Sequence, residues 1–154
     1  IRENIALPNL DILCNGAGVV NAKKEREMVD RTVRNLTIKL PNAEVNAASL
    51  SGGNQQKVVV GKWLIRDLKL LIVDEPTVGV DIGAKEEMYQ TIDRLSREGV
   101  AVMVVSSDLP ELTRLSDRII VLRKGRIIKE FTEGVVTEEE VLRAASGIVE
   151  GRAK

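Results

Sequence analysis

Uninterrupted runs of aliphatic residues mark three strands in the second half of the chain. The sequence is continuously apolar over residues 70–73, 100–105 and 119–122, with no polar residue alternating between the apolar ones. Such short, continuous apolar runs are typical of strands that are buried on both faces of a parallel sheet. We therefore predict three strands, each covered on both sides.

A helix is predicted between the first two strands. Residues 83–97 carry Met88, Ile92 and Leu95 at i, i+4 and i+7, which gives an amphipathic helix with one apolar side. Gly99 follows where such a helix would end, because glycine readily adopts the left-handed conformation of a helix C-terminus. Strands that alternate with helices indicate the α/β class.

A short helix is predicted after the second strand. Asp108 and Glu111 have the spacing of a capping box, and Pro110 falls in the first turn, where proline is tolerated. Leu112 and Leu115 would form the buried side of this helix.

The last part of the chain is predicted to form a hairpin and a helix. Lys124-Gly125 is a turn signal that would join the strand at 119–122 to a second, antiparallel strand at 127–131. Thr137 begins another capping-box pattern, which predicts a helix through Ala145.

The first fifty residues differ in character from the rest. One helix is predicted over residues 22–36, where Val29, Val33 and Leu36 have helical spacing, and Gly16-Ala-Gly18 is predicted to be a loop before it. Three divisions follow: a helical segment over residues 1–50, a main portion over 51–146, and a tail over 147–154.

Composition removes several kinds of chemistry. The chain has no histidine and one cysteine, Cys14, which excludes a Ser-His-Asp triad, histidine-based metal sites, cysteine-rich zinc modules and internal disulfides. Lysine plus arginine number 23 and aspartate plus glutamate number 23, so no net charge attracts the chain to nucleic acid.

The longest apolar run is far below the roughly 18 residues that a membrane-spanning helix needs. With one free thiol and no leader-like start, a cytosolic setting is favoured.

Two adjacent carboxylates, Asp74 and Glu75, follow the first predicted strand. Ligands in open α/β sheets bind at the carboxyl ends of strands. Asp74 could hold Mg²⁺ through water, while Glu75 could orient or deprotonate an attacking water molecule. The strand pattern alone fits equally well a strand that ends at the surface before Pro76.

Paired glycines precede a predicted helix about twenty residues earlier. Gly52 and Gly53 would let backbone N–H groups approach an anion closely at the helix N-terminus, and Ser51 would add a donor. The buried side of this helix is predicted to consist of Val59, Val60, Trp63 and Leu64. The simpler alternative is a serine-capped helix after a flexible turn.

These motifs occur together in an order that resembles a known family. The four segments are Leu50-Ser-Gly-Gly53, a hydrophobic strand ending in Asp74-Glu-Pro-Thr77, Gly79-Val-Asp81, and Asp117-Arg-Ile-Ile-Val-Leu-Arg-Lys-Gly125. In this order they look like the latter part of an ATP-binding cassette (ABC) ATPase, and the resemblance covers about residues 1–145. It implies a partial P-loop NTPase sheet with flanking helices and an N-terminal helical subdomain, without the phosphate-loop portion.

In that family ATP binds between two cassettes, so the resemblance divides the site residues between two nucleotides. Asp74 would lie on the magnesium shell of one ATP, Glu75 would act on its attacking water, and Asp81 would sit at the seam between the cassettes. The residues that would cover the γ-phosphate of the ATP held by the partner cassette are Ser51, Gly52, Gly53 and Gln55.

One departure from the family is the absence of a phosphate loop of the form G-x-x-x-x-G-K-[ST]. Neither Gly16-Ala-Gly18 nor Gly61-Lys62 fits this pattern. The chain also starts at Ile1 without a methionine, which suggests a cut fragment, although N-terminal processing would explain the same start. We therefore expect it to be the C-terminal portion of a cassette, and to be inactive as an isolated fragment.

The other departure is Ser107, at a position after the second strand where the family usually has histidine. A serine hydroxyl can donate a hydrogen bond but cannot take a positive charge, so hydrolysis at the Glu75 site is expected to be slow or to need help from its surroundings. Alternatively, Ser107 only caps the helix that begins near Asp108.

Three segments narrow the resemblance to a subfamily. Residues 50–57 (Leu-Ser-Gly-Gly-Asn-Gln-Gln-Lys), Ser106-Ser107 and residues 1–5 look like the second cassette of the tandem-cassette ATPases of bacterial monosaccharide importers of the ribose, galactose and xylose type. Val78 departs from that group, which often has arginine there.

That resemblance implies the cofactors ATP and Mg²⁺ and several partners. They are a second ABC cassette in the same polypeptide or a homodimer, membrane permease subunits, and indirectly a periplasmic or lipid-anchored sugar-binding protein. The protein would lie peripherally on the cytoplasmic face of the bacterial inner membrane.

Two alternative functions stay open at this point. The first is a soluble, non-transport cassette protein that acts in DNA repair, chromosome architecture or translation; the neutral charge and the lack of basic runs argue against it and against a nucleic-acid partner. The second is a catalytically weak, regulatory cassette half, in which this chain only completes the partner's ATP site.

Overall fold

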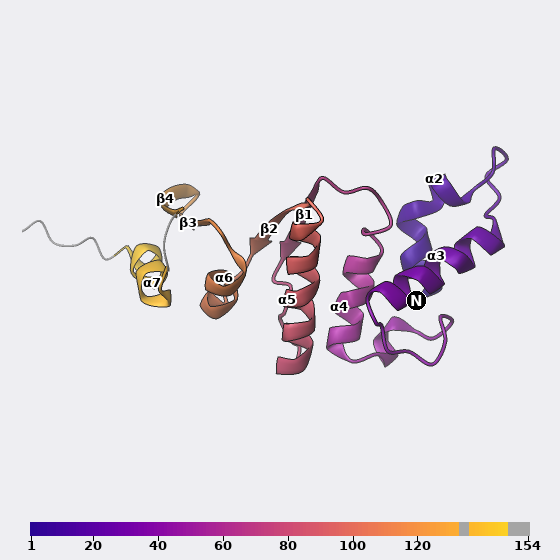
Figure 1. Cartoon of the computed structure of the whole chain (residues 1–154), viewed down its shortest axis with the longest axis horizontal. Coiled ribbons are helices and arrows are strands. Elements are labelled where there is room, and N and C mark those ends of the chain that lie inside the picture. Colours follow the sequence, from indigo (N-terminus) through magenta and orange to yellow (C-terminus); the bar gives the residue numbers. More distant parts are fainter. Residues whose placement is uncertain (133–135, 148–154) are drawn as a thin grey trace, which may run out of the picture. The chain divides into compact units, whose positions relative to one another are not determined.

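The computed structural model describes residues 1–132 and 136–147 of the chain (Figure 1). The chain divides into two units, one formed by residues 1–71 and 76–103, the other by residues 72–75 and the chain from 104 on. The predicted tail lies outside the described residues except for Gly147. In chain order the elements are α1 (Arg2–Ala6), η1 (Leu7–Asn9), α2 (Leu10–Leu13), α3 (Ala22–Asn35), η2 (Ala47–Ser49), α4 (Gly52–Gly61), β1 (Leu70–Asp74), α5 (Ile82–Arg97), β2 (Ala101–Val105), α6 (Leu109–Leu115), β3 (Ile119–Arg123), β4 (Arg126–Phe131) and α7 (Glu138–Ser146).

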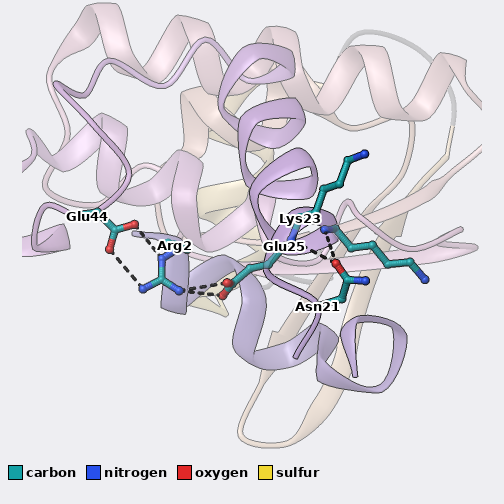
Figure 2. Close-up of polar contacts among 6 residues, drawn as sticks. Arg2, Asn21, Lys23, Glu25 and Glu44 are labelled. Carbon is teal, nitrogen blue, oxygen red and sulfur yellow. Dashed lines mark hydrogen bonds and ion pairs between the residues drawn. The ribbon is translucent and has the colours of Figure 1, made fainter. Parts of the chain in front are cut away.

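The first unit is built mainly from helices around an aliphatic core. The predicted helix over 22–36 is confirmed as α3, and Asn21 caps it by accepting hydrogen bonds from the N–H groups of Lys23 and Lys24 (Figure 2). The short helices α1 and α2 were not predicted, because four or five residues are too few to show a helical period. The buried members of this core are Ile1, Ile5, Val29, Leu36, Ile38 and Val58.

A forked ion pair joins α1 to α3 and to the loop that follows α3. Arg2 donates from Nε to Glu44 at 2.7 Å and from Nη1 to Glu25 at 3.0 Å, so that one guanidinium bridges two carboxylates (Figure 2). The hydrogen bond from Arg2 lowers the pKa of the Glu44 carboxyl below its usual range. The same contacts raise the pKa of Arg2, so this cation stays charged at any accessible pH.

A second polar cluster fixes the segment after α4 to the segment around α2. The side chain of Asn9 is fully buried and donates from Nδ2 to the carbonyls of Ile5 at 3.0 Å and Lys62 at 2.9 Å. Its Oδ1 accepts from Nε of Arg66, which also pairs with Asp11. Asn9 therefore satisfies buried polar groups from two separate stretches of chain.

The strands β1 and β2 are hydrogen-bonded neighbours, as the apolar runs predict. The N–H of Ala101 donates to the carbonyl of Lys69, and the N–H of Glu75 donates to the carbonyl of Val105. Both chains advance in the same direction between these two bonds, which is the order of a parallel pair.

The prediction that these strands are covered on both faces is wrong for the described residues. Burial alternates along β1, where Leu71 is buried while Leu70 is 52% and Ile72 60% exposed, and Met103 and Val105 are likewise exposed in β2. A continuous apolar run indicates that a strand can be covered on both faces. It does not show whether the described part of the chain supplies the elements that cover it.

The second unit contains the predicted hairpin and the last helices. β3 and β4 pair antiparallel through a turn at Lys124 and Gly125, both of which have a positive φ. Thr137 and Glu140 form the predicted capping box of α7. The core of this unit consists of Ile119, Val121 and Val141, with Leu109, Leu112, Phe131, Val136 and Ala144 packed against it.

The helix α6 differs in part from its prediction. Asp108 caps it as expected, through a hydrogen bond from the N–H of Glu111, but the buried residue of α6 is Glu111, while Leu112 and Leu115 are only half-buried. A helix of two turns can turn a capping residue inward, which hydrophobic spacing does not reveal. Over residues 1–132 and 136–147, no helix is both long and apolar enough to cross a membrane.

Candidate functional site

The N-terminus of α4 presents two of the predicted phosphate-facing residues to solvent. Ser51 is the N-cap residue and Gly52 begins the helix, and both are exposed. The Oγ of Ser51 accepts a hydrogen bond from Nδ2 of Asn54 at 2.9 Å. Because a hydroxyl can accept and donate at once, this contact leaves the Ser51 proton available for an anion. The first backbone N–H groups of α4 have no acceptor within the helix and can also donate to an anion.

Two amide side chains brace this end of α4. Asn54 accepts through Oδ1 from the N–H of Lys39 at 2.8 Å, so it connects Ser51 to the loop after α3. Gln55 donates from Nε2 to the carbonyl of Leu50 at 2.8 Å, directly before Ser51. The role of Asn54 was not predicted from the sequence, although an asparagine three residues after the N-cap is a signal for such a contact.

The prediction of the buried side of α4 is only partly correct, and its last member, Leu64, is half-buried against the core of the first unit. Val60 is buried as expected, but Val59 is 48% and Trp63 45% exposed, and Trp63 lies beyond the end of the helix. The residues of α4 that are buried are Gly53, Lys57, Val58, Val60 and Gly61. A lysine in the buried stripe displaces the apparent apolar face, which a hydrophobic pattern cannot show.

Lys57 is buried because it joins three segments of the first unit. Its side chain is 5% exposed, and Nζ lies 2.6 Å from Oε2 of Glu87 in α5 and donates to the carbonyl of Thr37 at 3.2 Å. The hydrogen bond from Lys57 lowers the pKa of the Glu87 carboxyl. The pair therefore fastens α4 to α5 one turn beyond the glycines.

Asp81, the residue assigned to the seam, has a structural role within its own chain. It is the N-cap of α5 and accepts through Oδ1 from the N–H of Ala84 at 2.9 Å. Gly79, two residues earlier, has φ +74°, a conformation that glycine adopts without strain. The exposed Asp81 side chain is thus held in one orientation by the helix that it caps.

In the second unit, the structure brings together Glu75 and Ser107, two of the predicted site residues. The N–H of Ser107 donates to Oε1 of Glu75 at 2.9 Å. Glu75 is one of the few non-glycine residues with a positive φ, at +48°, where residues with a Cβ are strained. The N–H of Glu75 itself donates to the carbonyl of Val105, the last residue of β2. Glu75 and Ser107 are therefore both held close to the ends of paired strands.

Asp74 ends β1 with an exposed side chain and can take one place in a magnesium shell. Over residues 1–132 and 136–147, no three His, Cys, Asp or Glu residues gather into a group that could hold a metal. Mg²⁺ keeps several water molecules and is commonly bound by one or two carboxylates and substrate phosphates. A single exposed carboxylate fits that mode of binding and does not fit an all-protein cage.

A sequence profile described as "ABC transporter" matches residues 1–78, half of the chain. The chain belongs to the ABC transporter family. The motifs from Ser51 to Thr77 lie within the matched range. The expected α/β fold of an ABC ATPase is confirmed by the structural neighbours.

Relatives of this ABC family member include ribose import ATP-binding proteins. The chain is 50% identical over 147 residues to the "Ribose import ATP-binding protein RbsA" of Bacillus subtilis (strain 168), and 44% identical over 147 residues to the protein of the same name from Hahella chejuensis. Both alignments cover 96% of this chain, which spans only 30% and 29% of the length of these two relatives.

Among solved structures, the chain resembles a dimeric bacterial ABC transporter cassette, MJ0796, with a TM-score of 0.71 and 27% identity. The match covers 86% of this chain and 56% of that one. A post-hydrolysis state of the same cassette, bound to ADP and Pi, matches with a TM-score of 0.71 and 26% identity over the same shares.

Proposed function

We propose that this chain is part of the ATP-binding and ATP-hydrolysing component of an ABC importer for a monosaccharide. The observation that carries the proposal is the 50% identity to a ribose import ATP-binding protein over 96% of the chain. The site geometry supports it, because a helix N-terminus is open to an anion while a strained glutamate lies beside an exposed aspartate.

Each site residue has a task in this proposal. Ser51, Gly52 and Gly53 cover the γ-phosphate of an ATP molecule held by a second cassette, and Gln55 holds the preceding turn in place. Glu75 accepts a proton from the attacking water, and Asp74 contributes to the Mg²⁺ shell through water. When bound, Mg²⁺ neutralises charge that develops on the phosphate oxygens.

The partners follow from the same proposal. A second cassette, in the same polypeptide or in a homodimer, meets this one at a seam that includes Asp81. Permease subunits hold the protein peripherally on the cytoplasmic face of the membrane, and a periplasmic or lipid-anchored sugar-binding protein acts through them. The dimeric state of the bacterial cassette MJ0796 supports the pairing of cassettes.

The test uses the full-length protein reconstituted with its permease in liposomes. We expect the rate of ATP hydrolysis to rise when the transported sugar is added. In Glu75→Gln the rate should fall to background, since an amide cannot accept the proton. Ser51→Arg should abolish turnover at the partner's site because the long side chain fills the phosphate position. Glu3→Gln and Ala48→Arg change exposed positions in α1 and η2 and serve as matched controls. An ATP hydrolysis rate that does not change when the permease is added would favour a soluble, non-transport cassette protein.

A catalytically weak half is the second candidate, and one observation favours it. Ser107 meets Glu75 through a main-chain N–H, and the chain contains no histidine that could contact the γ-phosphate from the switch position. If Glu75→Gln left turnover unchanged while Ser51→Arg abolished it, this chain would only complete the partner's site. Loss of turnover in both variants would assign both roles to it.

A further inference from the structure

The second glycine of the Ser51-Gly-Gly motif lies against another helix of its own unit. Gly53 is buried in the first turn of α4, and a Cβ built on it would lie 2.3 Å from Cβ of Ala84 in the first turn of α5. Carbon atoms pack at roughly 3.5–4.0 Å, so the two methyl groups would overlap by more than about 1 Å. Neither group is the end of a flexible side chain. The helices themselves would have to separate.

The first glycine touches the loop that leads into α5. A Cβ on Gly52 would lie 2.9 Å from the carbonyl oxygen of Gly79 and 3.6 Å from Cγ1 of Val80. This loop ends at Asp81, the N-cap of α5. Both glycines therefore face residues 79–84, and a reason for their lack of side chains exists within the chain, apart from any phosphate.

The contact continues one turn further along the same two helices, which lie side by side (Figure 1). Lys57 follows Gly53 by four residues and Glu87 follows Ala84 by three, so their ion pair stacks above the glycine contact on matching faces. The buried ammonium is also tied to the carbonyl of Thr37. α4 and α5 are thus joined at two successive turns.

We propose that Gly53 is a positioning residue whose missing side chain seats α4 on α5, and that this contact fixes Ser51 and Gly52 relative to Asp81. The inference rests on the proposed function, in which Ser51 serves the partner's ATP and Asp81 lies at the seam. The N-terminus of α4, where the phosphate would bind, is then held directly against the loop that begins α5. This role of Gly53 depends on its missing side chain and acts through packing against Ala84.

A double-mutant cycle in the full-length protein tests the proposal. Gly53→Ala should lower kcat about a hundredfold with little change in KM, because a displacement of about 1 Å at a remote support has an effect of this size. Ala84→Gly removes the opposing methyl group, so the double variant should regain most of the kcat of Ala84→Gly alone. If Gly53 were needed for a close backbone approach to phosphate, the double variant would be as defective as Gly53→Ala, and the proposal would be overturned.

A distance measurement separates this inference from the proposed function. Spin labels at Val59→Cys in α4 and Gln90→Cys in α5, both exposed, with Cys14→Ser, report the spacing of the helices without ATP. We expect the distribution to shift by about 1 Å or to broaden in Gly53→Ala and to return in the double variant. An unchanged distribution in Gly53→Ala would overturn the packing claim. The expected shift in a protein without ATP turnover would support the packing while refuting the proposed function.

Discussion

The main-chain N–H of Ser107 donates a hydrogen bond to the side chain of Glu75, with 2.9 Å between the nitrogen and Oε1. The two residues follow neighbouring strands, β1 and β2, and the backbone of Glu75 adopts a positive φ of +48° as the chain leaves the sheet. The donor belongs to the backbone, so any residue except proline could supply it. This hydrogen bond therefore requires the backbone N–H at position 107 and does not require a particular side chain there.

The first prediction compares two substitutions of Ser107. Ser107→Ala keeps the N–H and should retain most of the ATP turnover of the full-length protein. Ser107→Pro removes the donor; a hydrogen bond to a charged group contributes about 1.5–3 kcal/mol, so kcat should fall about ten- to hundredfold. Steady-state kinetics at saturating ATP measures both. An equal loss in the two variants would mean that the hydroxyl is the working group.

The second prediction concerns the ion pair between Lys57 and Glu87. Removing one partner of a buried pair leaves the other charge unpaired, and here only Lys57 is deeply buried, since Glu87 is 46% exposed. Glu87→Gln should therefore destabilise the protein by about 1–3 kcal/mol, whereas Lys57→Met, which fills the same space with an apolar chain, should cost less. Urea unfolding of both variants gives the comparison. The reverse order would show that the charge on Lys57 is well solvated.

The third prediction is the pH dependence of the same pair. Hydrogen bonding from Lys57 lowers the pKa of folded Glu87 below its usual value of 4.5. A carboxyl with a depressed folded pKa stabilises the protein fully above its unfolded pKa, and this stabilisation is lost as the pH falls through the folded value. The stability difference between the wild type and Glu87→Gln should thus be constant near neutrality and shrink from about pH 4.5 downward. Urea midpoints measured from about pH 7 to about pH 3.5 test it, and a difference that grew on acidification would contradict the assignment.

The sequence predicts the strands and longer helices well because they follow from local patterns. The apolar runs locate β1, β2 and β3, the spacing of Met88, Ile92 and Leu95 locates α5, and the Thr137 capping box begins α7. Each of these signals is contained within one element. None of them depends on which other part of the chain packs against it.

What the sequence could not predict depends on contacts between distant segments. The buried face of α4 includes Lys57 because Glu87, thirty residues later, pairs with it. Gly53 is buried because Ala84 packs so closely against it that a side chain would not fit. The strained φ of Glu75 and its bond to Ser107 likewise appear only once two strands are paired. The sequence identified the glycines as candidates for anion binding. The close approach of residues 79–84 to these glycines involves segments about thirty residues apart, which no local pattern reveals.

The fourth prediction concerns Asn9, a buried polar side chain that hydrophobic patterning did not single out. Its Nδ2 donates to the carbonyls of Ile5 and Lys62, and its Oδ1 accepts from Arg66. Asn9→Leu has a similar volume but leaves these groups without that partner, so we expect a loss of about 2–3 kcal/mol. Asn4→Leu, at an exposed position of α1, is the matched control and should change stability by less than about 0.5 kcal/mol.

The same variant distinguishes a local from a global role for Asn9. Because Asn9 joins the segment around α2 to the carbonyl of Lys62 just after α4, its loss should weaken the protection of amide protons on both sides of the contact. Hydrogen exchange in Asn9→Leu should therefore be faster both in α1, where Ile5 lies, and at the end of α4. Faster exchange confined to α1 would show that the bond to Lys62 contributes little, and that the contacts of Arg66 with Asp11 and with the carbonyl of Pro8 hold the two segments together.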